Sequence, residues 1–410
     1  MKCPTEFFDC FEDWKPQEKN EFIRYQWSVL APVFEEGDYN DVPHYIIHDQ
    51  NQLPFTHFEG SSELAYRCPR DTSIVHIHPG HHRFSDKTLS KRGFEIKSFH
   101  KDDLEAFKQE IRIASKFKGD NKHENMATLL ATFELTYERQ YKFHMIYYRA
   151  DGDLYDYWEK AHPFPDFSYD NMLWASGQFQ GLAHGLLATQ APYLALGHIS
   201  AERSNPACPQ NLFGQHDGME PSNILYYLKP GSANPNLVIY NFGVSEMTPH
   251  EAGSPRFTIT YRAPEYDIEN KLPGQPADIW TLGCVYLEFV AWLLDGRSLV
   301  DRFTRQRRSP DKTFKIDCDT FFNSDEAGNL KVKDAVVMMI AEFHSHPRCT
   351  QYLHEFLELI EHGMLVINPE GRVKCWRLHE RLDAMWKKCQ SNKDYAMKPL
   401  PKPDVSVDVP

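Results

Sequence analysis

Hydrophobic periodicity changes near residue 150, and this change most strongly limits what the chain can fold into. Before it, apolar residues alternate in short pieces typical of strands, interrupted by one helical pattern over 102–117. After it, apolar residues recur at the spacing of long helices. A strand-rich piece followed by a helix-rich piece predicts an α+β fold with two unequal lobes. The expected strands are 73–78, 93–100, 128–135 and 142–148, and the expected helices are 171–187, 278–294, 333–343, 351–360 and 378–388.

The two ends of the chain differ from its middle. Residues 1–45 carry large apolar side chains at helical spacing, until Gly37 and Pro43 interrupt the pattern; these side chains are Phe22, Tyr25, Trp27, Leu30 and Phe34. We therefore expect a helical extension over 1–45, a strand-rich lobe over 46–149, a helical lobe over 150–392 and a Pro-rich tail over 393–410. The tail is expected to be extended and disordered, with a polyproline ligand for an SH3-type partner as the alternative.

Composition excludes several classes of protein. The chain has 45 Lys and Arg against 58 Asp and Glu, a formal net charge of −13, so no nucleic-acid partner is expected. Its nine cysteines are dispersed, with no CxxC pair, which indicates reduced thiols in an intracellular, cytoplasmic or nuclear protein. The longest apolar stretch, 281–294, contains Glu288 and is short enough to be a buried helix, so no membrane association is expected.

Three polar segments leave alternatives open. Long loops are expected over 197–214 and 296–317, and the second carries the run RFTRQRR, either a solvated basic face or an anion site. The segment HIHPGHH is dense in imidazoles but has no Cys or acidic ligand at familiar zinc spacing, so a metal site is not expected there. Its histidines are His76, His78, His81 and His82.

Residues 214–225 read GQHDGMEPSNIL, with a His, a Pro, an Asn and two apolar residues at set intervals. The segment resembles the catalytic loop of protein kinases, whose pattern is H-R-D-x-K-x-x-N followed by two apolar residues. His216 and Asn223 occupy their positions in that pattern. The position of the Asp that accepts the substrate's hydroxyl proton holds Gly218, and the position of the phosphate-facing Lys holds Glu220.

Further segments resemble protein-kinase motifs in the expected order. The segment 237–243, LVIYNFG, is similar to the strand that ends in D-F-G, with Asn241 in place of the metal-binding Asp. The segment 258–265, TITYRAPE, matches T-x-x-Y-x-A-P-E, and DIWTLGC begins at Asp278 as does the long central helix of the family. The resemblance implies that Arg372 pairs with Glu265 of A-P-E and that this pair is architectural.

The strand-rich lobe carries the upstream motifs. The segment FEIK ends at Lys97 and resembles V-A-I-K, and Glu110 follows 13 residues later on the expected helix. The segment MIYYRADGDL resembles the hinge. The resemblance covers about 55–390 and is most like fungal kinase-like proteins. The nucleotide-site residues that it implies are Lys97, Glu110, Gly60 of the degenerate glycine-rich loop GSSELA, Ile146 as gatekeeper, Tyr148 in the hinge, Asp153 toward the ribose, Asn223 and Asn241.

The departures from the family pattern converge on the phosphates. Gly218 offers no base, and a positioned base contributes about 10²–10⁴ in rate. Glu220 places a negative charge where a cation normally neutralises the transferred phosphoryl group. Asn223 and Asn241 are two neutral amides and would make a weak Mg²⁺ site, because Mg²⁺ prefers carboxylate oxygens. The loop at Gly60 keeps a single glycine of the three that allow the backbone to approach phosphate closely.

Three residues have alternative interpretations. Asp217 stands one position before Gly218 and would serve as the base if the loop shifted by one residue; otherwise it is a solvated loop acid. Lys97 and Glu110 either orient nucleotide phosphates or simply tie the helix to the sheet.

We therefore expect a pseudokinase that acts on protein partners as a scaffold or allosteric component. One alternative is an active Ser/Thr kinase that uses Asp217, and another is a module that binds ATP without turnover. ATP, with weakly held Mg²⁺, is the one expected cofactor.

Overall fold

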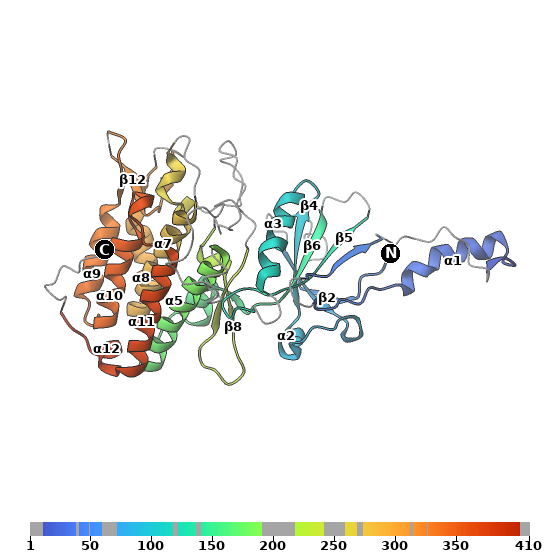
Figure 1. Ribbon diagram of the computed structural model, residues 1–410, viewed down its shortest axis with the longest axis horizontal. Coiled ribbons are helices and arrows are strands. Elements are labelled where there is room, and N and C mark those ends of the chain that lie inside the picture. The colour runs from blue at the N-terminus through green and yellow to red at the C-terminus, as the bar shows by residue number, and fades with distance from the viewer. Residues whose placement is uncertain are drawn as a thin grey trace, which may run out of the picture. The chain divides into compact units, whose positions relative to one another are not determined.

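The computed structural model describes residues 11–37, 41–48, 50–59, 72–117, 122–136, 141–190, 218–241, 259–268, 274–311, 315–325 and 327–401 (Figure 1). The chain forms two compact units. Unit 1 contains residues 1–122 and 127–149, and unit 2 contains residues 123–126 and 150–410. Unit 1 is built mainly from strands and unit 2 mainly from helices, which confirms the predicted α+β fold class.

A six-stranded sheet forms the centre of unit 1, in the order β1-β5-β6-β4-β3-β2. Strand β1 runs parallel to β5, and every other neighbouring pair is antiparallel. The four strands expected from the sequence are present and begin and end within a residue of the predicted bounds. The strands are β1 (His44–Ile47), β2 (Phe55–Glu59), β3 (Thr72–Ile77), β4 (Phe94–His100), β5 (Leu129–Leu135) and β6 (Tyr141–Tyr148).

Helix α3 (Leu104–Ala114) packs on this sheet through one aromatic side chain. The ring of Phe107 lies 5.5 Å from that of Phe99 on β4 and 5.0 Å from that of Phe143 on β6. A 3₁₀ turn over Ser115–Phe117 continues the helix. This packing fixes the face of α3 that looks toward the sheet, and with it the direction of Glu110.

A short helix, α2 (Lys87–Arg92), precedes β4 and has well-defined ends. The Asp86 carboxylate accepts hydrogen bonds from the backbone N–H groups of Thr88 and Leu89, both at 2.9 Å, as an N-cap residue does. Gly93 ends the helix with φ of 102°, a conformation that glycine adopts readily and other residues adopt at a cost. The chain then enters β4.

The N-terminal helical pattern divides into a helix and an extended segment. Helix α1 spans Pro16–Val29, and its Phe22 and Tyr25 side chains are exposed. Phe34 was expected on the same helix, but it forms an isolated bridge with His82 and is fully buried, with its ring 5.8 Å from that of Phe133. Burial against the sheet therefore ends the helical pattern before Phe34.

The imidazole-rich segment HIHPGHH serves the packing of unit 1. His81 Nδ1 lies 3.0 Å from the backbone oxygen of Pro32, and His78 Nδ1 accepts a hydrogen bond from the backbone N–H of Gly80. The His82 ring stacks on Phe84 at 5.2 Å. Each of these three rings makes a hydrogen bond or a stacking contact within unit 1. The density of histidines in the sequence did not indicate these contacts.

Unit 2 is organised around two long helices, α5 (Tyr169–Gln190) and α7 (Gln275–Asp295). Phe179 of α5 contacts the rings of Phe289 on α7 and Phe356 on α10 at 4.8 and 4.5 Å. The other helices of unit 2 are α4 (Leu154–Asp156), α8 (Arg297–Arg307), α9 (Asp334–Ser345), α10 (Gln351–Leu359), α11 (Cys375–Ser391) and α12 (Lys393–Met397), with π-helical turns over Tyr157–Ala161 and Ile360–Met364.

Small sheets and 3₁₀ turns complete unit 2. A three-stranded sheet has the order β7-β8-β9, and two hairpin-like pairs join β10 to β11 and β12 to β13. The strands are β7 (Gly152–Asp153), β8 (Ile224–Tyr227), β9 (Asn236–Ile239), β10 (Ser309–Pro310), β11 (Asp317–Cys318), β12 (Phe322–Ser324) and β13 (Leu330–Val332). The 3₁₀ turns cover Pro221–Asn223, Ile259–Tyr261, Pro264–Asp267 and Pro369–Gly371.

Among the described residues, α7 is the one helix long and apolar enough to cross a membrane, with a mean hydropathy of 1.4. The whole of its apolar window is buried inside the structure, which is how the core helix of a globular domain behaves. A close approach also depends on Gly283, because a Cβ there would lie 2.9 Å from the Cβ of Met364. The helix is therefore the centre of unit 2, as predicted.

Two predicted irregular segments contain helices. Residues 296–317 were expected to be a loop, yet α8 occupies Arg297–Arg307, and Arg307 is fully buried rather than part of a solvated face. Residues 393–401 were expected to be disordered, yet α12 begins at Lys393 and Pro399 forms a bridge with Thr350. Both segments are polar or Pro-rich, and contacts with distant residues give them their structure.

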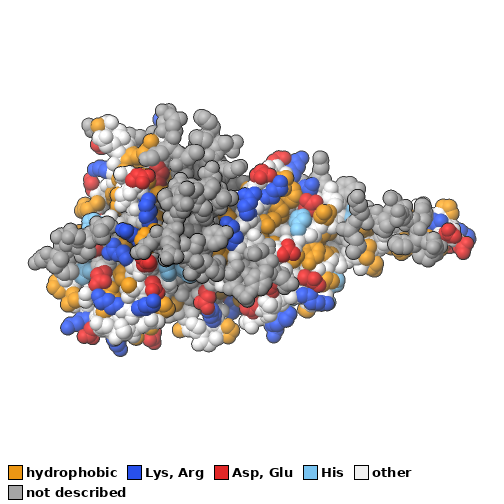
Figure 2. All heavy atoms as spheres, in the orientation of Figure 1, with side chains coloured by type: hydrophobic (Ala, Val, Ile, Leu, Met, Phe, Trp, Pro, Cys, Tyr) orange, Lys and Arg blue, Asp and Glu red, His pale blue; other side chains and the backbone are white. Residues whose placement is uncertain are grey.

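Charged side chains of both signs are intermingled over the face drawn in Figure 2, with Lys and Arg next to Asp and Glu among the residues described there. Elsewhere in the described part of the chain, Arg302 and Glu342 form an exposed ion pair between α8 and α9. The visible described surface is therefore mixed in charge rather than divided into large fields of one sign.

Three histidines join residues 123–126 to the helices of unit 2. His123 Nε2 lies 2.9 Å from His184 Nδ1, and the ring of His184 stacks on that of His379 at 4.5 Å. Burial, followed by the neighbouring His184, lowers the pKa of both His123 and His379 to about 4. The folded state therefore holds these two rings in their neutral form at neutral pH.

This cluster predicts a loss of stability in mild acid. The unfolded chain binds protons on these histidines below about pH 6.5, whereas the folded state resists protonation until about pH 4. Their contribution is complete above pH 6.5 and declines as the pH falls toward 4. Urea unfolding at pH 7.0 and 4.5 should show a larger decrease for the wild type than for His123→Gln. If the free energy of unfolding decreased equally in both proteins, His123 would not contribute to the pH dependence of stability.

Candidate functional site

In unit 1, Lys97 and Glu110 form a buried ion pair. Strand β4 carries Lys97 and helix α3 carries Glu110, and Lys97 Nζ donates to Glu110 Oε2. Glu110 is fully buried, while the Lys97 side chain remains 15% exposed. The structure thus brings together the two residues whose spacing resembled the Lys–Glu pair of kinases, with the ammonium group as the more accessible partner.

A third residue, Tyr147, completes this pair and was missed by the sequence analysis. Its hydroxyl group donates to Glu110 Oε1 at 2.8 Å, so each carboxylate oxygen accepts a hydrogen bond from a different side chain. A buried carboxylate requires such partners, because an uncompensated charge in the interior is costly. The alternation of β6, which turns Tyr147 toward α3, was the signal that could have identified it.

The two other residues assigned to unit 1 have side chains committed to its core. Ile146 is fully buried and pairs in register with Ile96 on β4. The Tyr148 hydroxyl accepts a hydrogen bond from the backbone N–H of Asp86 at 3.1 Å, and the Tyr148 ring stacks on Phe94. Burial raises the pKa of Tyr148 to about 12. Within unit 1, the Tyr148 side chain is therefore an anchor for α2.

In unit 2, Asn223 and Asn241 lie side by side. The turn Pro221–Asn223 leads directly into β8, and Ile224 pairs with Ile239 of β9. This pairing brings the end of β9 next to Asn223, where Asn241 Nδ2 donates to Asn223 Oδ1 at 3.3 Å. The backbone N–H of Tyr240 donates to the backbone oxygen of Asn223 at 2.9 Å. The two amides predicted as weak Mg²⁺ ligands are thus in contact.

The polar groups of Asn223 are directed toward its own loop and toward Asn241. Asn223 Nδ2 donates to the backbone oxygen of Gly218 at 2.7 Å, so position 218 contributes a carbonyl to the loop and no side chain to chemistry. Asn241 adopts φ of 68°, a left-handed conformation that Asn tolerates better than most residues. A carboxylate oxygen, the ligand that Mg²⁺ prefers, is missing from both of these side chains.

Glu220 places a negative charge at the start of the same turn. It is largely buried, and its Oε1 accepts a hydrogen bond from Ser222 Oγ. Burial and then the charge of Glu288 raise the pKa of Tyr155, and Glu220 adds to this effect. A carboxylate at this position repels a phosphate group instead of neutralising it.

Asp153 and Asp278 both support local structure in unit 2. Asp153 is the N-cap of α4, and its Oδ1 accepts from the backbone N–H of Asp156 at 2.9 Å. Asp278 is fully buried in the first turns of α7, and its Oδ2 accepts from Gln190 Nε2 at 2.9 Å. The carboxylate assigned to a ribose contact by resemblance therefore also caps a helix.

Glu265 and Arg372 form a two-pronged buried ion pair. Arg372 Nη1 and Nη2 donate to the two carboxylate oxygens of Glu265, each at 2.7 Å. Arg372 also donates to the backbone oxygens of Val366 and Pro276, both at 2.8 Å. Its guanidinium group lies over the Trp280 ring at 5.2 Å. This geometry gives the pair an architectural role that joins residues far apart in the chain.

A second buried network was not expected from the sequence. Tyr261, from the TITYRAPE segment, donates to Glu288 Oε2 at 2.6 Å, and Arg307 Nη2 donates to Glu288 Oε1 at 2.5 Å. The Tyr155 and Tyr261 hydroxyl groups are hydrogen-bonded to each other. The acidic residue inside the apolar run of α7 was the available signal, since a buried Glu needs a cationic partner.

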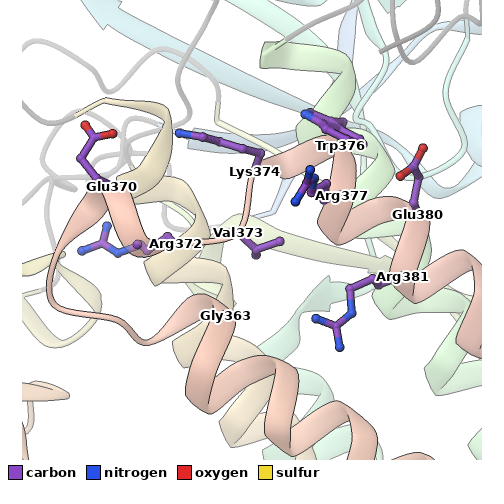
Figure 3. A pocket seen from close by; sticks show the side chains of 10 residues that line it. Gly363, Glu370, Arg372, Val373, Lys374, Trp376, Arg377, Glu380 and Arg381 are labelled. Atoms are coloured by element: carbon purple, nitrogen blue, oxygen red, sulfur yellow. The ribbon is translucent and has the colours of Figure 1, made fainter. Parts of the chain in front are cut away.

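A pocket of about 670 Å³ lies beside the start of α11 (Figure 3). Its lining includes four basic side chains, Arg372, Lys374, Arg377 and Arg381, and two acidic ones, Glu370 and Glu380. The lining is thus mixed in sign, unlike the single-sign sites that bind phosphate. Because Arg372 lines this pocket, the pocket adjoins the architectural ion pair.

Several assigned or discussed positions lie outside the described residues. These include Gly60 of the predicted phosphate loop, the loop expected over 197–214, His216 and Asp217 of the catalytic-like loop, and the segment 242–258 that follows Asn241. The proposed base Asp217 consequently stays a prediction. The described candidate residues form two separate groups, each within its own unit: Lys97, Glu110 and Tyr147 in unit 1, and Gly218, Glu220, Asn223 and Asn241 in unit 2.

Comparison with known proteins shows similarity to protein kinases. No protein-family model matches the chain. It is similar to cyclin-dependent kinase 11 of Dictyostelium discoideum, with 27% identity over 177 residues, 38% of this chain and 42% of that protein. It is also similar to cyclin-dependent kinase 7 of the same organism, with 34% identity over 87 residues, 20% of this chain and 22% of that protein.

A third relative is mitogen-activated protein kinase spk1 of Schizosaccharomyces pombe, with 30% identity over 82 residues, 18% of this chain and 21% of that protein. The matched part spans less than half the length of each of these relatives. These low-identity similarities, with the α+β fold of a β-rich and a helical unit, support a protein-kinase-like superfamily and a kinase-like bilobal fold.

Proposed function

We propose that this protein is an intracellular pseudokinase that acts through protein partners. The observation that carries the proposal is the state of the loop around Asn223. Its amide group is bonded to the carbonyl of Gly218 and to the amide of Asn241, and position 218 has no side chain. Neither a proton acceptor nor a carboxylate metal ligand is present at these described positions. Glu220 adds a charge of the wrong sign.

One alternative has its own support. The Lys97–Glu110 pair is formed, and Lys97 remains partly exposed, so unit 1 retains the cation that contacts nucleotide phosphates in kinases. A module that binds ATP without turnover is therefore our second candidate. An active Ser/Thr kinase with Asp217 as its base is the third, and it would still require catalysis next to Glu220 and Asn241.

A thermal-shift titration of the wild type with ATP, with and without Mg²⁺ or Mn²⁺, tests the proposal. A nucleotide at about 100 times its dissociation constant stabilises the folded state by roughly 2.7 kcal/mol, which is easily measured. We expect no Mg²⁺-dependent shift and no phosphate transfer to a generic substrate. A metal-independent shift that Lys97→Met abolishes and Lys91→Ala retains would support the ATP-binding module, because Lys91 is an exposed lysine on α2.

The triple variant Gly218→Asp, Glu220→Lys and Asn241→Asp serves as the companion experiment. It restores the base, the phosphate-facing cation and the metal ligand of the family pattern, and we expect it to gain Mg²⁺-dependent ATP binding. A triple variant that folds but still binds no ATP would show that unit 1 is also disabled. Phosphate transfer by the wild type, abolished by Asp217→Ala, would overturn the pseudokinase proposal in favour of the active kinase.

A further inference from the structure

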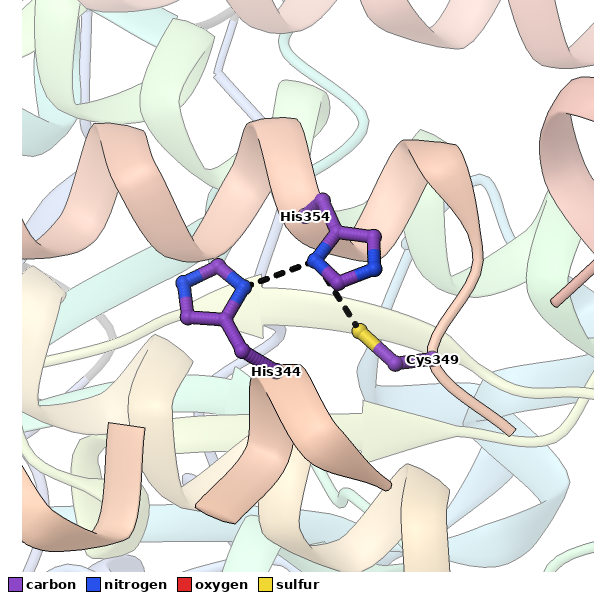
Figure 4. Close-up of side chains that lie close together, drawn as sticks. All are labelled: His344, Cys349 and His354. Carbon is purple, nitrogen blue, oxygen red and sulfur yellow. Dashed lines mark hydrogen bonds between the residues drawn. The ribbon is translucent and has the colours of Figure 1, made fainter. Parts of the chain in front are cut away.

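Three side chains of the metal-binding type converge inside unit 2, away from the kinase-like motifs (Figure 4). His344 lies in the last turn of α9, His354 lies on α10, and Cys349 lies in the connection between them. One ligand-type atom from each residue lies within 4.8 Å of the others, and all three residues are buried. The spacing in the chain is His-x₄-Cys-x₄-His.

The distances within this cluster approach those of a metal site. His354 Nδ1 lies 3.7 Å from Cys349 Sγ, and a nitrogen and a sulfur bound to one tetrahedral Zn²⁺ lie about 3.6 Å apart. His344 Nδ1 lies 2.7 Å from His354 Nδ1, whereas two nitrogens on one Zn²⁺ lie roughly 3.3 Å apart. For this pair of imidazoles, metal binding would thus require the two Nδ1 atoms to separate by about half an ångström.

The second nitrogen of His354 is held as in many metal sites. His354 Nε2 lies 2.8 Å from the backbone oxygen of Leu400, and a carbonyl oxygen only accepts hydrogen bonds. The proton of neutral His354 is therefore on Nε2, and the Nδ1 lone pair faces His344 and Cys349. A hydrogen bond from the outer nitrogen of a ligating His to a backbone carbonyl is a common means of orienting the ring.

The C-terminal segment closes over this cluster. The backbone N–H of Leu400 donates to the backbone oxygen of Cys349 at 3.1 Å, and Pro399 forms a bridge with Thr350. A cation bound by His344, Cys349 and His354 would therefore connect α9, α10 and residues 399–400. The sequence predicted disorder for this segment. A bound cation would therefore help to hold residues 399–400 against α10.

We propose that His344, Cys349 and His354 form a site for a thiophilic divalent cation, with Zn²⁺ as the expected ion. Two imidazoles and a thiolate match the ligand preference of Zn²⁺, and a water molecule would complete the tetrahedron. On binding, the Cys349 thiol releases one proton to solvent as the sulfur–metal bond forms. The proton on His344 Nδ1 is replaced by one on Nε2, so the imidazoles remain neutral.

Titration of the chelator-treated full-length protein with Co²⁺, followed by displacement with Zn²⁺, tests this site. We expect one equivalent of Co²⁺, with a near-ultraviolet thiolate-to-cobalt absorption band and a tetrahedral visible spectrum. Zn²⁺ should remove both signals and raise the melting temperature. If the wild type did not bind Co²⁺ stoichiometrically, the proposal would be wrong. The cluster would then be explained by the hydrogen bond between His344 and His354.

Matched variants identify the ligands. Cys349→Ala should lose the charge-transfer band and weaken Zn²⁺ binding by at least about 100-fold, the upper end of the loss caused by removing outer-shell partners. Cys389→Ala should bind as the wild type does, because Cys389 is equally buried but lies beside Ser176. His344→Gln provides a second test if Cys349→Ala does not fold. An intact band in folded Cys349→Ala, or an unchanged Zn²⁺ affinity in folded His344→Gln, would refute the assigned ligand set.

Discussion

Arg372→Ala should destabilise the protein by about 3–5 kcal/mol, the usual cost of removing one partner of a buried ion pair. The substitution leaves the Glu265 carboxylate buried and without the two 2.7 Å hydrogen bonds that it now accepts from Arg372. It also removes the donors to the backbone oxygens of Val366 and Pro276. Urea unfolding followed by circular dichroism measures the change in free energy of unfolding.

Arg302→Ala is the matched control for this effect. Arg302 pairs with Glu342, but both side chains are more than a third exposed, and such pairs contribute roughly 0–1 kcal/mol. The two pairs share their chemistry, since each joins an Arg to a Glu with two hydrogen bonds, but the Glu265–Arg372 pair is buried and Arg372 has further backbone acceptors. If Arg372→Ala were no more destabilising than Arg302→Ala, the architectural role of the Glu265–Arg372 pair would have to be abandoned.

Arg307→Met should also lower the free energy of unfolding by about 3–5 kcal/mol, because it leaves the buried Glu288 carboxylate without its cationic partner. Arg307 is fully buried, donates to Glu288 at 2.5 Å and to the backbone oxygen of Asp319 at 3.0 Å, and lies between two aromatic rings. The rings are those of Phe303 and Phe321, with centroids 4.0 and 4.1 Å away. Methionine preserves most of the apolar contact with the two rings. The Glu288 carboxylate keeps the hydrogen bond from the neutral Tyr261 hydroxyl but loses the one from the Arg307 guanidinium group.

A double-mutant cycle separates the charge from the packing. Glu288→Gln removes the stranded charge, so Arg307→Met combined with Glu288→Gln should be more stable than Arg307→Met alone. The free energy of unfolding of all four proteins gives the coupling energy. Strictly additive losses would indicate that the two residues contribute independently, and that Arg307 acts mainly through its contacts with the phenylalanines.

The fold was predictable where burial produces a strong periodic pattern. Strands β3, β4, β5 and β6 and the long helices of unit 2 were identified because their apolar side chains recur with the period of the element. Helix α8 was missed because RFTRQRR is too polar to indicate a buried face. The structure of that segment depends on Arg307 meeting Glu288, which lies 19 residues away in the chain.

The candidate site was predictable to a similar degree. Motif order indicated that Lys97 would face Glu110 and that Asn223 would approach Asn241, and the structure brings each pair together. Motif order did not indicate that Tyr147 donates a hydrogen bond to Glu110, because this contact depends on which side of β6 faces α3. The cluster of His344, Cys349 and His354 was missed because its two five-residue intervals differ from familiar zinc spacings.

By itself, the sequence determined the α+β class, the order of the kinase-like motifs and the absence of an acidic side chain at positions 218 and 241. Residue identity alone decides which chemical groups are available. Tertiary structure alone decided that Arg307 and Glu288 share a buried network, that the C-terminal segment packs against Cys349, and that Tyr147 binds Glu110. Such contacts join residues that are distant in the chain, and their stability comes from excluding water around paired polar groups. A local sequence pattern does not predict which distant residues will meet.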